Sequence, residues 1–151
     1  MKSHSEEQLL AEPSIVAEVG AKLGARLSPA TLVLDGGARV DVDGVDVDRT
    51  TFAETFARQG RLKAGQYKKV AWDALKLITI AQARPDAVLA LGFASQEAAD
   101  CVTGKSWLSE ALTAWGIKVI VVDLDQAVRD SILLAQARQI MVNSDTASLA
   151  S

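Results

Sequence analysis

Cysteine and histidine are almost absent from this chain of 151 residues, which contains one of each. The single cysteine, Cys101, cannot form an internal disulfide, and we interpret it as a small buried hydrophobic residue. The single histidine, His4, lies in an N-terminal tail that we expect to be mobile. These absences exclude a zinc site built from Cys and His, and they exclude Ser-His or Cys-His catalytic pairs with an embedded histidine.

Long apolar segments are also missing. No apolar run approaches the roughly 20 residues that a membrane-spanning helix needs. The N-terminal segment carries acidic residues and lacks the apolar stretch of a signal peptide. Hydrophobic residues make up 49% of the chain and charged residues 23%, which is typical of a globular protein. We therefore expect one soluble domain over residues 1–151, located in the cytoplasm and without a membrane partner.

The hydrophobic pattern predicts a mixed α/β fold. Apolar residues at helical spacing alternate with short β-favouring runs. The expected elements are helices at 5–27, 66–83, 95–115 (broken) and 125–142, and strands at 31–34, 39–45, 51–57, 87–91 and 118–123. We expect Pro13 to interrupt the first helix, Gly116 to end the third, and residues 143–151 to fray. An antiparallel meander followed by parallel crossovers favours one mixed sheet with helices on both faces.

Positive charge is concentrated in residues 58–76. This segment has six Lys and Arg against one Asp, a local net charge of +5, which leaves −8 on the rest of a chain whose total is −3. Such a segment can attract phosphate groups although the chain as a whole is acidic. A solvated helix face that happens to be basic is the alternative.

The third expected strand carries a carboxylate between two aromatic rings. Phe52, Glu54 and Phe56 share one face of this strand because side chains alternate. A buried carboxylate needs a partner or a metal, and a salt bridge to Arg58 or Arg39 is one possible arrangement. In the other, Asp43 on the preceding strand lies beside Glu54, since eleven residues and one turn separate them.

Two carboxylates at a sheet surface form a site for hard cations such as Mg²⁺. Asp41 projects from the same strand as Asp43, and either aspartate taken alone is interpreted as a turn or edge-strand residue. A metal pocket next to the basic segment has the components that phosphodiester hydrolysis requires.

The helix at 66–83 presents a polar stripe formed by Gln66, Lys69, Asp73 and Lys76, which are spaced three, four and three residues apart. Lys69 and Asp73 can simply pair on a solvated face. Alternatively, the N-terminal end of the stripe, with Gln66 and Lys69, overhangs the strand ends where Glu54 sits.

The stretch VDVDGVDVDRTTFAETFARQGRLKAGQYKKVAWDALKL at 40–77 resembles small bacterial proteins placed near the PD-(D/E)XK nuclease superfamily. The resemblance covers about residues 5–91 and implies a restriction-endonuclease-like α-βββ-α-β core, with residues 95–142 as an α-β-α extension. It implies Asp43 and Glu54 as ligands of Mg²⁺ or Mn²⁺. The family expects a lysine two residues after the Glu, where this chain has Phe56, so Lys69, or less favourably Lys63, would supply that charge.

Two other motifs are given no functional role. The segment Thr103-Gly104-Lys105-Ser106 lacks the earlier glycine and the preceding strand of a phosphate-binding P-loop, and Ser106 is expected to cap the next helix instead. Trp72, Trp107 and Trp115 are interpreted as core or interface residues, because nothing arranges them for base stacking.

Two functions remain open. The first is Mg²⁺-dependent hydrolysis of nucleic acid, with Asp43, Glu54 and Lys69 as catalytic residues. The second is an inactive nuclease-fold module for binding or assembly, which the missing lysine at Phe56 favours. The expected nucleic-acid contacts are Arg58, Arg61, Lys63, Gln66 and Lys68. A homodimer is the other partnership that we keep open.

Overall fold

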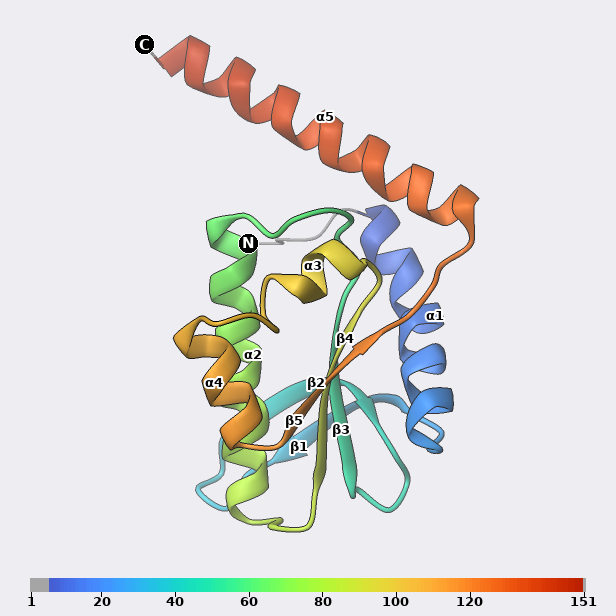
Figure 1. Cartoon of the computed structure of the whole chain (residues 1–151), viewed down its shortest axis with the longest axis vertical. Coiled ribbons are helices and arrows are strands. Elements are labelled where there is room, and N and C mark those ends of the chain that lie inside the picture. The colour runs from blue at the N-terminus through green and yellow to red at the C-terminus, as the bar shows by residue number, and fades with distance from the viewer. Residues whose placement is uncertain (1–5, 151) are drawn as a thin grey trace.

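The computed structural model describes residues 6–150, with side chains described as far as residue 143. One five-stranded sheet lies between helices, and a long last helix crosses one end of the molecule (Figure 1). The elements in chain order are α1 (Glu6–Leu23), β1 (Ser28–Val33), β2 (Arg39–Val45), β3 (Thr51–Phe56), α2 (Ala64–Gln82), β4 (Val88–Phe93), α3 (Gln96–Asp100), α4 (Trp107–Ala114), β5 (Ile117–Val121) and α5 (Gln126–Ala150).

The strands lie in the sheet in their chain order, β1-β2-β3-β4-β5. The pairs β1–β2 and β2–β3 are antiparallel, whereas β3–β4 and β4–β5 are parallel. The parallel pairs need crossovers, which α2 and then α3 with α4 provide. The α/β class and the single mixed sheet expected from the sequence are confirmed.

Helices cover both faces of the sheet. α1 packs on one face, where Ile15 and Val19 are fully buried against small side chains such as Ala53. α2, α3 and α4 cover the other face, where the stacked rings of Phe56 and Phe93 lie in the main core. Strand β3 is central and all six of its residues are buried, so any polar group on it must find a partner inside the protein.

The residues expected at the two ends of α4 are found there. Ser106 is the N-cap of α4, and its hydroxyl accepts a hydrogen bond from the backbone N–H of Ser109. Gly116 follows α4 with a positive φ of 67°, a conformation that suits glycine at a helix C-terminus. Among the described residues, no helix is long and apolar enough to cross a membrane.

Three expectations about helices and aromatic residues were wrong or incomplete. α1 continues through Pro13 without a break, because burial of its apolar stripe outweighs the loss of one backbone hydrogen bond. The frayed tail was predicted at 143–151, but α5 extends to Ala150. Of the two roles expected for Trp72, Trp107 and Trp115, the core role is wrong, since they are 71%, 71% and 51% exposed, and the interface role stays a prediction.

Two single residues were also predicted from the sequence. Cys101 is half-buried rather than buried, and its thiol donates to the carbonyl of Glu97 at 3.4 Å. His4, which was expected in a mobile tail, lies outside the described residues.

Candidate functional site

An irregularity in strand β2 sets up the site. The register of β1 against β2 shifts between Ser28 and Ala30, so that Pro29 stands opposite two residues, Asp43 and Gly44. Proline has no backbone N–H to give to a neighbouring strand, and an extra residue of this kind forms a β-bulge that redirects the side chain. The bulge turns Asp43 out of the regular alternation of β2.

Strands β2 and β3 separate at the bulge. They pair only at Gly44 with Ala53 and at Val45 with Phe52. Beyond this point the Asp43 carboxylate takes the place of a backbone acceptor, because its Oδ2 atom accepts from the backbone N–H of Thr55 at 2.9 Å and from the Thr55 hydroxyl at 3.2 Å. The side chain of Asp43 therefore lies between the two strands and reaches both faces of the sheet.

Three carboxyl groups meet at this opening. Asp43 is hydrogen-bonded both to Glu54 from β3 and to Glu12 from α1. Glu54 is only 2% exposed, which agrees with its predicted burial between two phenylalanines. The sequence-based expectation that Asp43 and Glu54 lie side by side is met in the structure, and Glu12 joins them.

The buried Glu54 has a cationic partner from α2. The Lys76 ammonium lies 3.1 Å from Glu54 Oε1 and donates to the backbone carbonyl of Asp41 at 2.9 Å. The alternative of a salt bridge was therefore right in kind but named the wrong partners, since Lys76, and neither Arg58 nor Arg39, pairs with Glu54. The reason is the position of α2, which packs over β3 and directs its polar stripe at the carboxyl groups.

A second lysine completes the polar stripe of α2. Lys69 Nζ lies 2.8 Å from Asp73 Oδ2, and Asp73 is 1% exposed. The Lys69 ammonium also lies over the Phe56 ring, 5.6 Å from its centroid. Asp73 and Lys76 approach each other at 3.7 Å, so the two lysines and Asp73 form one network. The pairing of Lys69 with Asp73 occurs at the edge of the site rather than on a solvated face.

Acidic groups outnumber basic groups in this network. Four carboxyls, from Glu12, Asp43, Glu54 and Asp73, share two ammonium groups. Burial, and then the charge of Asp43, raise the pKa of Glu54 to about 9. Burial and the hydrogen bond to Asp43 raise the pKa of Glu12 to about 7. Near neutral pH, Glu54 is therefore protonated and Glu12 is close to half-protonated.

In Asp43 and Lys76 the charged form is favoured, because hydrogen bonds or opposite charges nearby outweigh the cost of burying the charge. Burial disfavours the charge of Asp43, but hydrogen bonds donated by Glu12, Glu54 and Thr55 outweigh it and lower the pKa of Asp43. Burial likewise disfavours the charge of Lys76, but the nearby carboxyls outweigh it and raise the pKa of Lys76. Asp43 therefore stays ionised at neutral pH and accepts hydrogen bonds from the protonated carboxyl groups of its neighbours Glu54 and Glu12.

A small pocket opens beside these groups, between α1, the split strands and the start of α2. It has a volume of about 80 Å³, and is lined by Gln8, Glu12, Ile15, Asp43, Thr55, Ala57 and Lys69. This volume is enough for a few water molecules or a hydrated ion. Asp43 and Lys69, two of the predicted catalytic residues, therefore line the same pocket.

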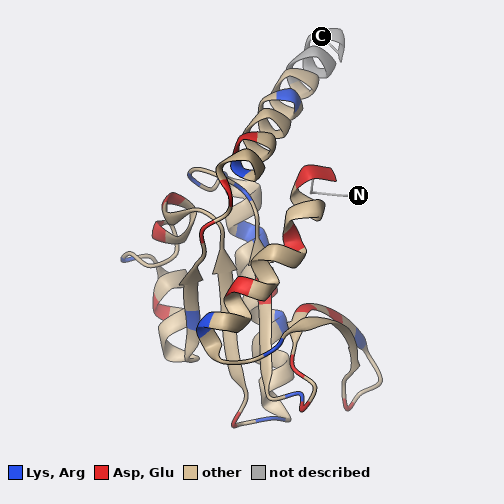
Figure 2. Cartoon of the chain, turned by 90° about the vertical axis from the view of Figure 1, so that its right-hand side faces the viewer, with Lys and Arg blue, Asp and Glu red and all other residues tan. Residues whose placement is uncertain are grey.

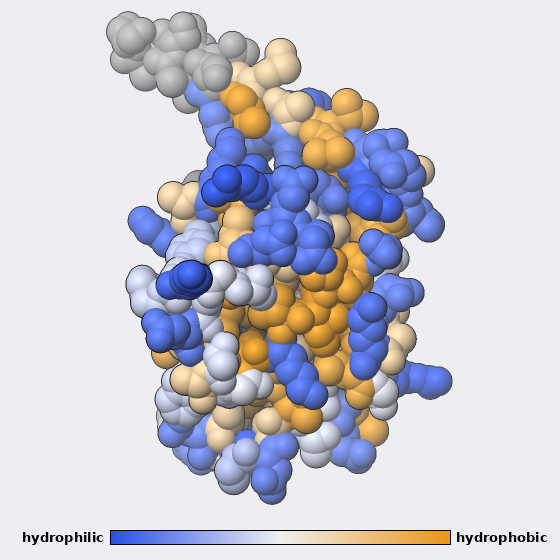
Figure 3. Space-filling model, viewed as in Figure 1, coloured by the Kyte–Doolittle hydropathy of each residue, from blue (hydrophilic) through white to orange (hydrophobic). Residues whose placement is uncertain are grey.

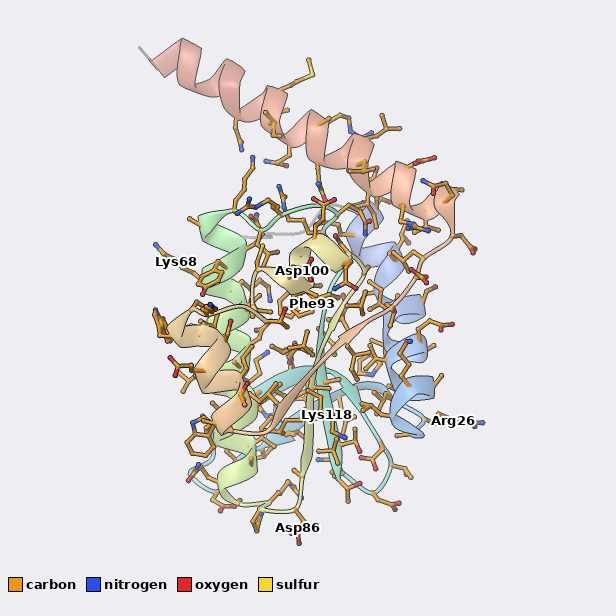
Figure 4. All side chains as sticks on the ribbon, in the orientation of Figure 1. Arg26, Lys68, Asp86, Phe93, Asp100 and Lys118 are labelled. Carbon is orange, nitrogen blue, oxygen red and sulfur yellow. The ribbon has the colours of Figure 1, made fainter. Side chains whose placement is uncertain are left out.

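The predicted nucleic-acid contacts surround the start of α2 but differ in availability. Arg61, Lys63 and Lys68 are exposed, and Lys68 projects from α2 into solvent (Figure 4). Gln66 accepts from the backbone N–H of Lys63 at 3.1 Å, so it stabilises the helix start. The Nε atom of Arg58 is buried without a hydrogen-bond partner, and burial lowers the pKa of Arg58.

Glu12 and Lys76 were not assigned to the carboxylate site from the sequence. Glu12 lies three residues before Ile15 and seven before Val19, on the buried stripe of α1. A carboxylate at such a position is a detectable signal, because a charged residue on a buried helix face needs a partner. Lys76 was recognised in the polar stripe, but its distance from Glu54 depends on how α2 packs.

The donor set suits a hard divalent cation. Mg²⁺ usually takes one or two carboxylates and completes its shell with water and phosphate oxygens, and the pair of Asp43 and Glu54 meets this need. One oxygen of Glu54 is engaged by Lys76. Within residues 6–143, whose side chains are described, no group of three or more His, Cys, Asp and Glu is arranged to hold a metal.

Comparisons with protein-family models, with curated proteins and with solved structures returned no match to this chain. The function of the site must therefore be argued from its own geometry and chemistry.

Proposed function

We propose that this chain is a metal-dependent nuclease-like domain of the PD-(D/E)XK type, which hydrolyses phosphodiester bonds of nucleic acid. In this proposal α1 to β4 form the restriction-endonuclease-like core, and α3 to α5 with β5 are an extension. The observation that carries the proposal is the juxtaposition of the Asp43 and Glu54 carboxyl groups at the split between β2 and β3. Asp43 of this pair also lines the pocket, together with Lys69 from the most basic segment of the chain.

The excess of acid supports a cation at this position. Four carboxyls and two ammonium groups leave two negative charges uncompensated when all are ionised. A single divalent cation carries the charge that would balance them, and it would replace the protons on Glu54 and Glu12. Asp43 and Glu54 are the proposed ligands, and Glu12 stands beside them to bind directly or through water.

The bound cation would supply charge neutralisation and an activated water molecule for attack on phosphorus. The residues of this chain do the remaining work. Asp43 is held in place by two hydrogen bonds from Thr55, so its carboxylate is pre-oriented. Glu12 lines the pocket beside Asp43, and once the cation has displaced its proton, its carboxylate would accept a proton from water.

Lys69 is the proposed replacement for the lysine that the family carries in the strand. Phe56 occupies that strand position, and the Lys69 ammonium lies over its ring at 5.6 Å. The ammonium group of Lys69 thus approaches the same region from α2 instead of β3. It lines the pocket with Asp43, where a positive charge would stabilise the developing charge on a phosphate.

The competing proposal is an inactive module of the same fold that binds nucleic acid or assembles with a partner. Its support is the Lys76–Glu54 contact at 3.1 Å, which already engages one oxygen of the carboxyl group that a metal would need. In this second proposal the carboxylate cluster is structural.

Thermal melts and a cleavage assay separate the two proposals. For the nuclease we expect Mg²⁺ or Mn²⁺ to raise the Tm of the wild type, and Asp43→Asn to abolish both this rise and the nicking of a supercoiled plasmid. Lys69→Met should keep the metal-dependent rise in Tm but lower the cleavage rate about 100-fold, in the range for one stabilising group. Lys22→Met, at an exposed lysine in the last turn of α1 and outside the basic segment, is the control and should cleave like the wild type.

A wild type whose Tm ignores divalent ions, and which leaves both plasmid and single-stranded substrates intact, would favour the binding module. If the wild type binds metal but does not cleave, the proposed cation site is supported and the proposed nuclease activity is rejected.

A further inference from the structure

Helix α5 lies across the end of the molecule and extends well past it (Figures 1 and 2). One side of its N-terminal half is docked, since Ile132 is fully buried and Ala135 is 4% exposed. Gln136 exchanges hydrogen bonds with the backbone of Gln59 at 2.9 and 3.1 Å, and Arg138 pairs with Glu7 of α1. α5 is therefore positioned by the body of the protein through one helix face.

The other face of α5 carries an apolar stripe that nothing in the described chain covers. Leu133, Leu134, Ile140 and Met141 are 46%, 63%, 49% and 66% exposed, and Ala137 between them is exposed as well. Their spacing of one, four, seven and eight residues from Leu133 places them on one side of a helix. Figure 3 shows apolar side chains gathered along this helix, and exposed apolar patches of this kind commonly mark interaction sites.

The stripe is symmetric about Ala137. Leu133 and Met141 are each four residues from it, and Leu134 and Ile140 are each three residues from it. A second copy of α5, antiparallel and related by a twofold axis through Ala137, would therefore meet the first with matching partners: Leu133 against Met141, Leu134 against Ile140, and Ala137 against itself. A twofold interface requires such a self-complementary surface, and the small side chain of Ala137 lets the helices approach closely.

We propose that this α5 stripe is the interface of a homodimer, formed by two antiparallel α5 helices that cross at Ala137. The charge of the helix favours a second copy over a lipid surface, because membrane-bound helices carry polar faces rich in Lys and Arg. α5 has only Arg129 and Arg138, and Arg138 is paired with Glu7.

The surface next to the crossing point can enlarge the contact. Leu10 of α1 is 72% exposed and lies one turn after Glu7, which is bound to Arg138 beside Ala137. A standard interface buries roughly 800 Å² on each partner, more than one short helical stripe supplies. We therefore expect a dimer that dissociates on dilution, with Leu10 at its rim.

Sedimentation over a concentration series tests the interface. The wild type should shift from monomer to dimer as its concentration rises, while the double variant Leu134→Glu with Ile140→Glu should stay monomeric with an unchanged circular dichroism spectrum. Val47→Glu is the matched control, because Val47 is 93% exposed in the β2–β3 turn, and this variant should dimerise like the wild type. A wild type that stays monomeric, or a double variant that still dimerises, overturns the proposal.

Cysteine cross-linking tests the geometry in a Cys101→Ser background oxidised with diamide. Ala137→Cys should form a disulfide-linked dimer, whereas Gln139→Cys, on another side of α5, should not. A mixture of Leu133→Cys and Met141→Cys chains should cross-link only between the two types. Cross-links within each type would indicate parallel helices and contradict the antiparallel arrangement. Binding of the monomer to anionic lipid vesicles, in place of dimerisation, would assign the stripe to a membrane surface.

Discussion

At the scale of single residues, Glu54 is unusual because its carboxyl group is buried in the protein. It is 2% exposed, faces Asp43 and Asp73, and has Lys76 as its nearest cation. Its pKa of about 9 follows from burial first and from the charge of Asp43 second. Folding therefore binds a proton on Glu54 that the unfolded chain releases above its ordinary pKa of 4.5.

This proton uptake makes stability depend on pH with a definite sign. Between pH 4.5 and about 9 the folded state holds a proton on Glu54 that the unfolded state lacks, so stability falls as pH rises, by up to about 1.4 kcal/mol per pH unit. Glu12 adds the same trend up to about pH 7. We expect urea unfolding of the wild type to give a free energy that declines from pH 6 to pH 9.

Replacing Glu54 by glutamine should flatten this decline above pH 7. The amide imitates the protonated carboxyl, since its oxygen can accept from Lys76 and its nitrogen can donate to Asp43. We therefore expect Glu54→Gln to match or exceed the wild type in stability at pH 8, measured without metal. Glu18→Gln, on the exposed side of α1, is the control and should keep the wild-type slope. A loss of roughly 3 kcal/mol at pH 7 would instead identify Glu54 as an ionised structural partner of Lys76.

The individual site residues differ in how far the sequence could predict them. Strand alternation and one turn were enough to predict that Asp43 and Glu54 lie close together, because they are on consecutive strands. Glu12 reaches the same point from α1, 31 positions before Asp43, and its approach depends on how a helix docks on a sheet. The bulge at Asp43 and Gly44 left one trace in the sequence, because Val45 breaks the alternation that residues 39–43 keep, but that trace alone does not show where Asp43 points.

At the scale of elements, the docking of α1 on the sheet depends on one close approach. Gly92 of β4 lies under Val19 of α1, and a Cβ atom at Gly92 would stand 2.4 Å from Val19 Cγ2. Val19 is fully buried, so it has no free space to move into. Since α1 also brings Glu12 to Asp43, this contact helps to position the carboxylate cluster.

We expect Gly92→Ala to destabilise the protein by about 1–3 kcal/mol, the usual cost of overpacking a core. Gly104→Ala provides the control, because no atom lies within 4 Å of a Cβ there, and its unfolding free energy should change by less than about 0.5 kcal/mol. Adding Val19→Ala to Gly92→Ala should restore part of the loss. If the two substitutions simply add in urea unfolding, the contact does not limit the packing of α1.

Element positions were more predictable than element packing. The three strands within 28–56 follow from alternation and glycine turns, which are local signals. The path of α1 through Pro13 depends on burial of its apolar stripe, and the position of α5 depends on the docking of Ile132 and Ala135. Helix propensity and proline rules, which consider one residue at a time, could not predict either.

At the scale of the whole molecule, charge is divided between opposing regions. Residues 58–76 hold a net charge of +5 within a chain of −3, and Figure 2 shows acidic positions spread along α1 on another side. An acidic chain repels nucleic acid at long range, so any attraction must come from the basic loop and the start of α2. Screening by salt should weaken both effects, but contacts to phosphate dominate at short distance.

Nucleic-acid binding should therefore be weak, strongly dependent on salt and localised. We expect the affinity for a labelled duplex, measured by fluorescence anisotropy from 50 to 300 mM salt, to fall linearly on logarithmic axes. The triple variant Arg61→Ala, Lys63→Ala and Lys68→Ala should bind more weakly at 50 mM and with a shallower slope, by about 0.9 for each phosphate that the variant no longer neutralises. Arg26→Ala with Lys118→Ala, two positions remote from α2 (Figure 4), should leave the slope as in the wild type. Losses of affinity in proportion to the charges removed, three in the triple variant and two in the control, would mean that binding follows net charge rather than a site. An absence of binding at 50 mM would remove nucleic acid as the substrate.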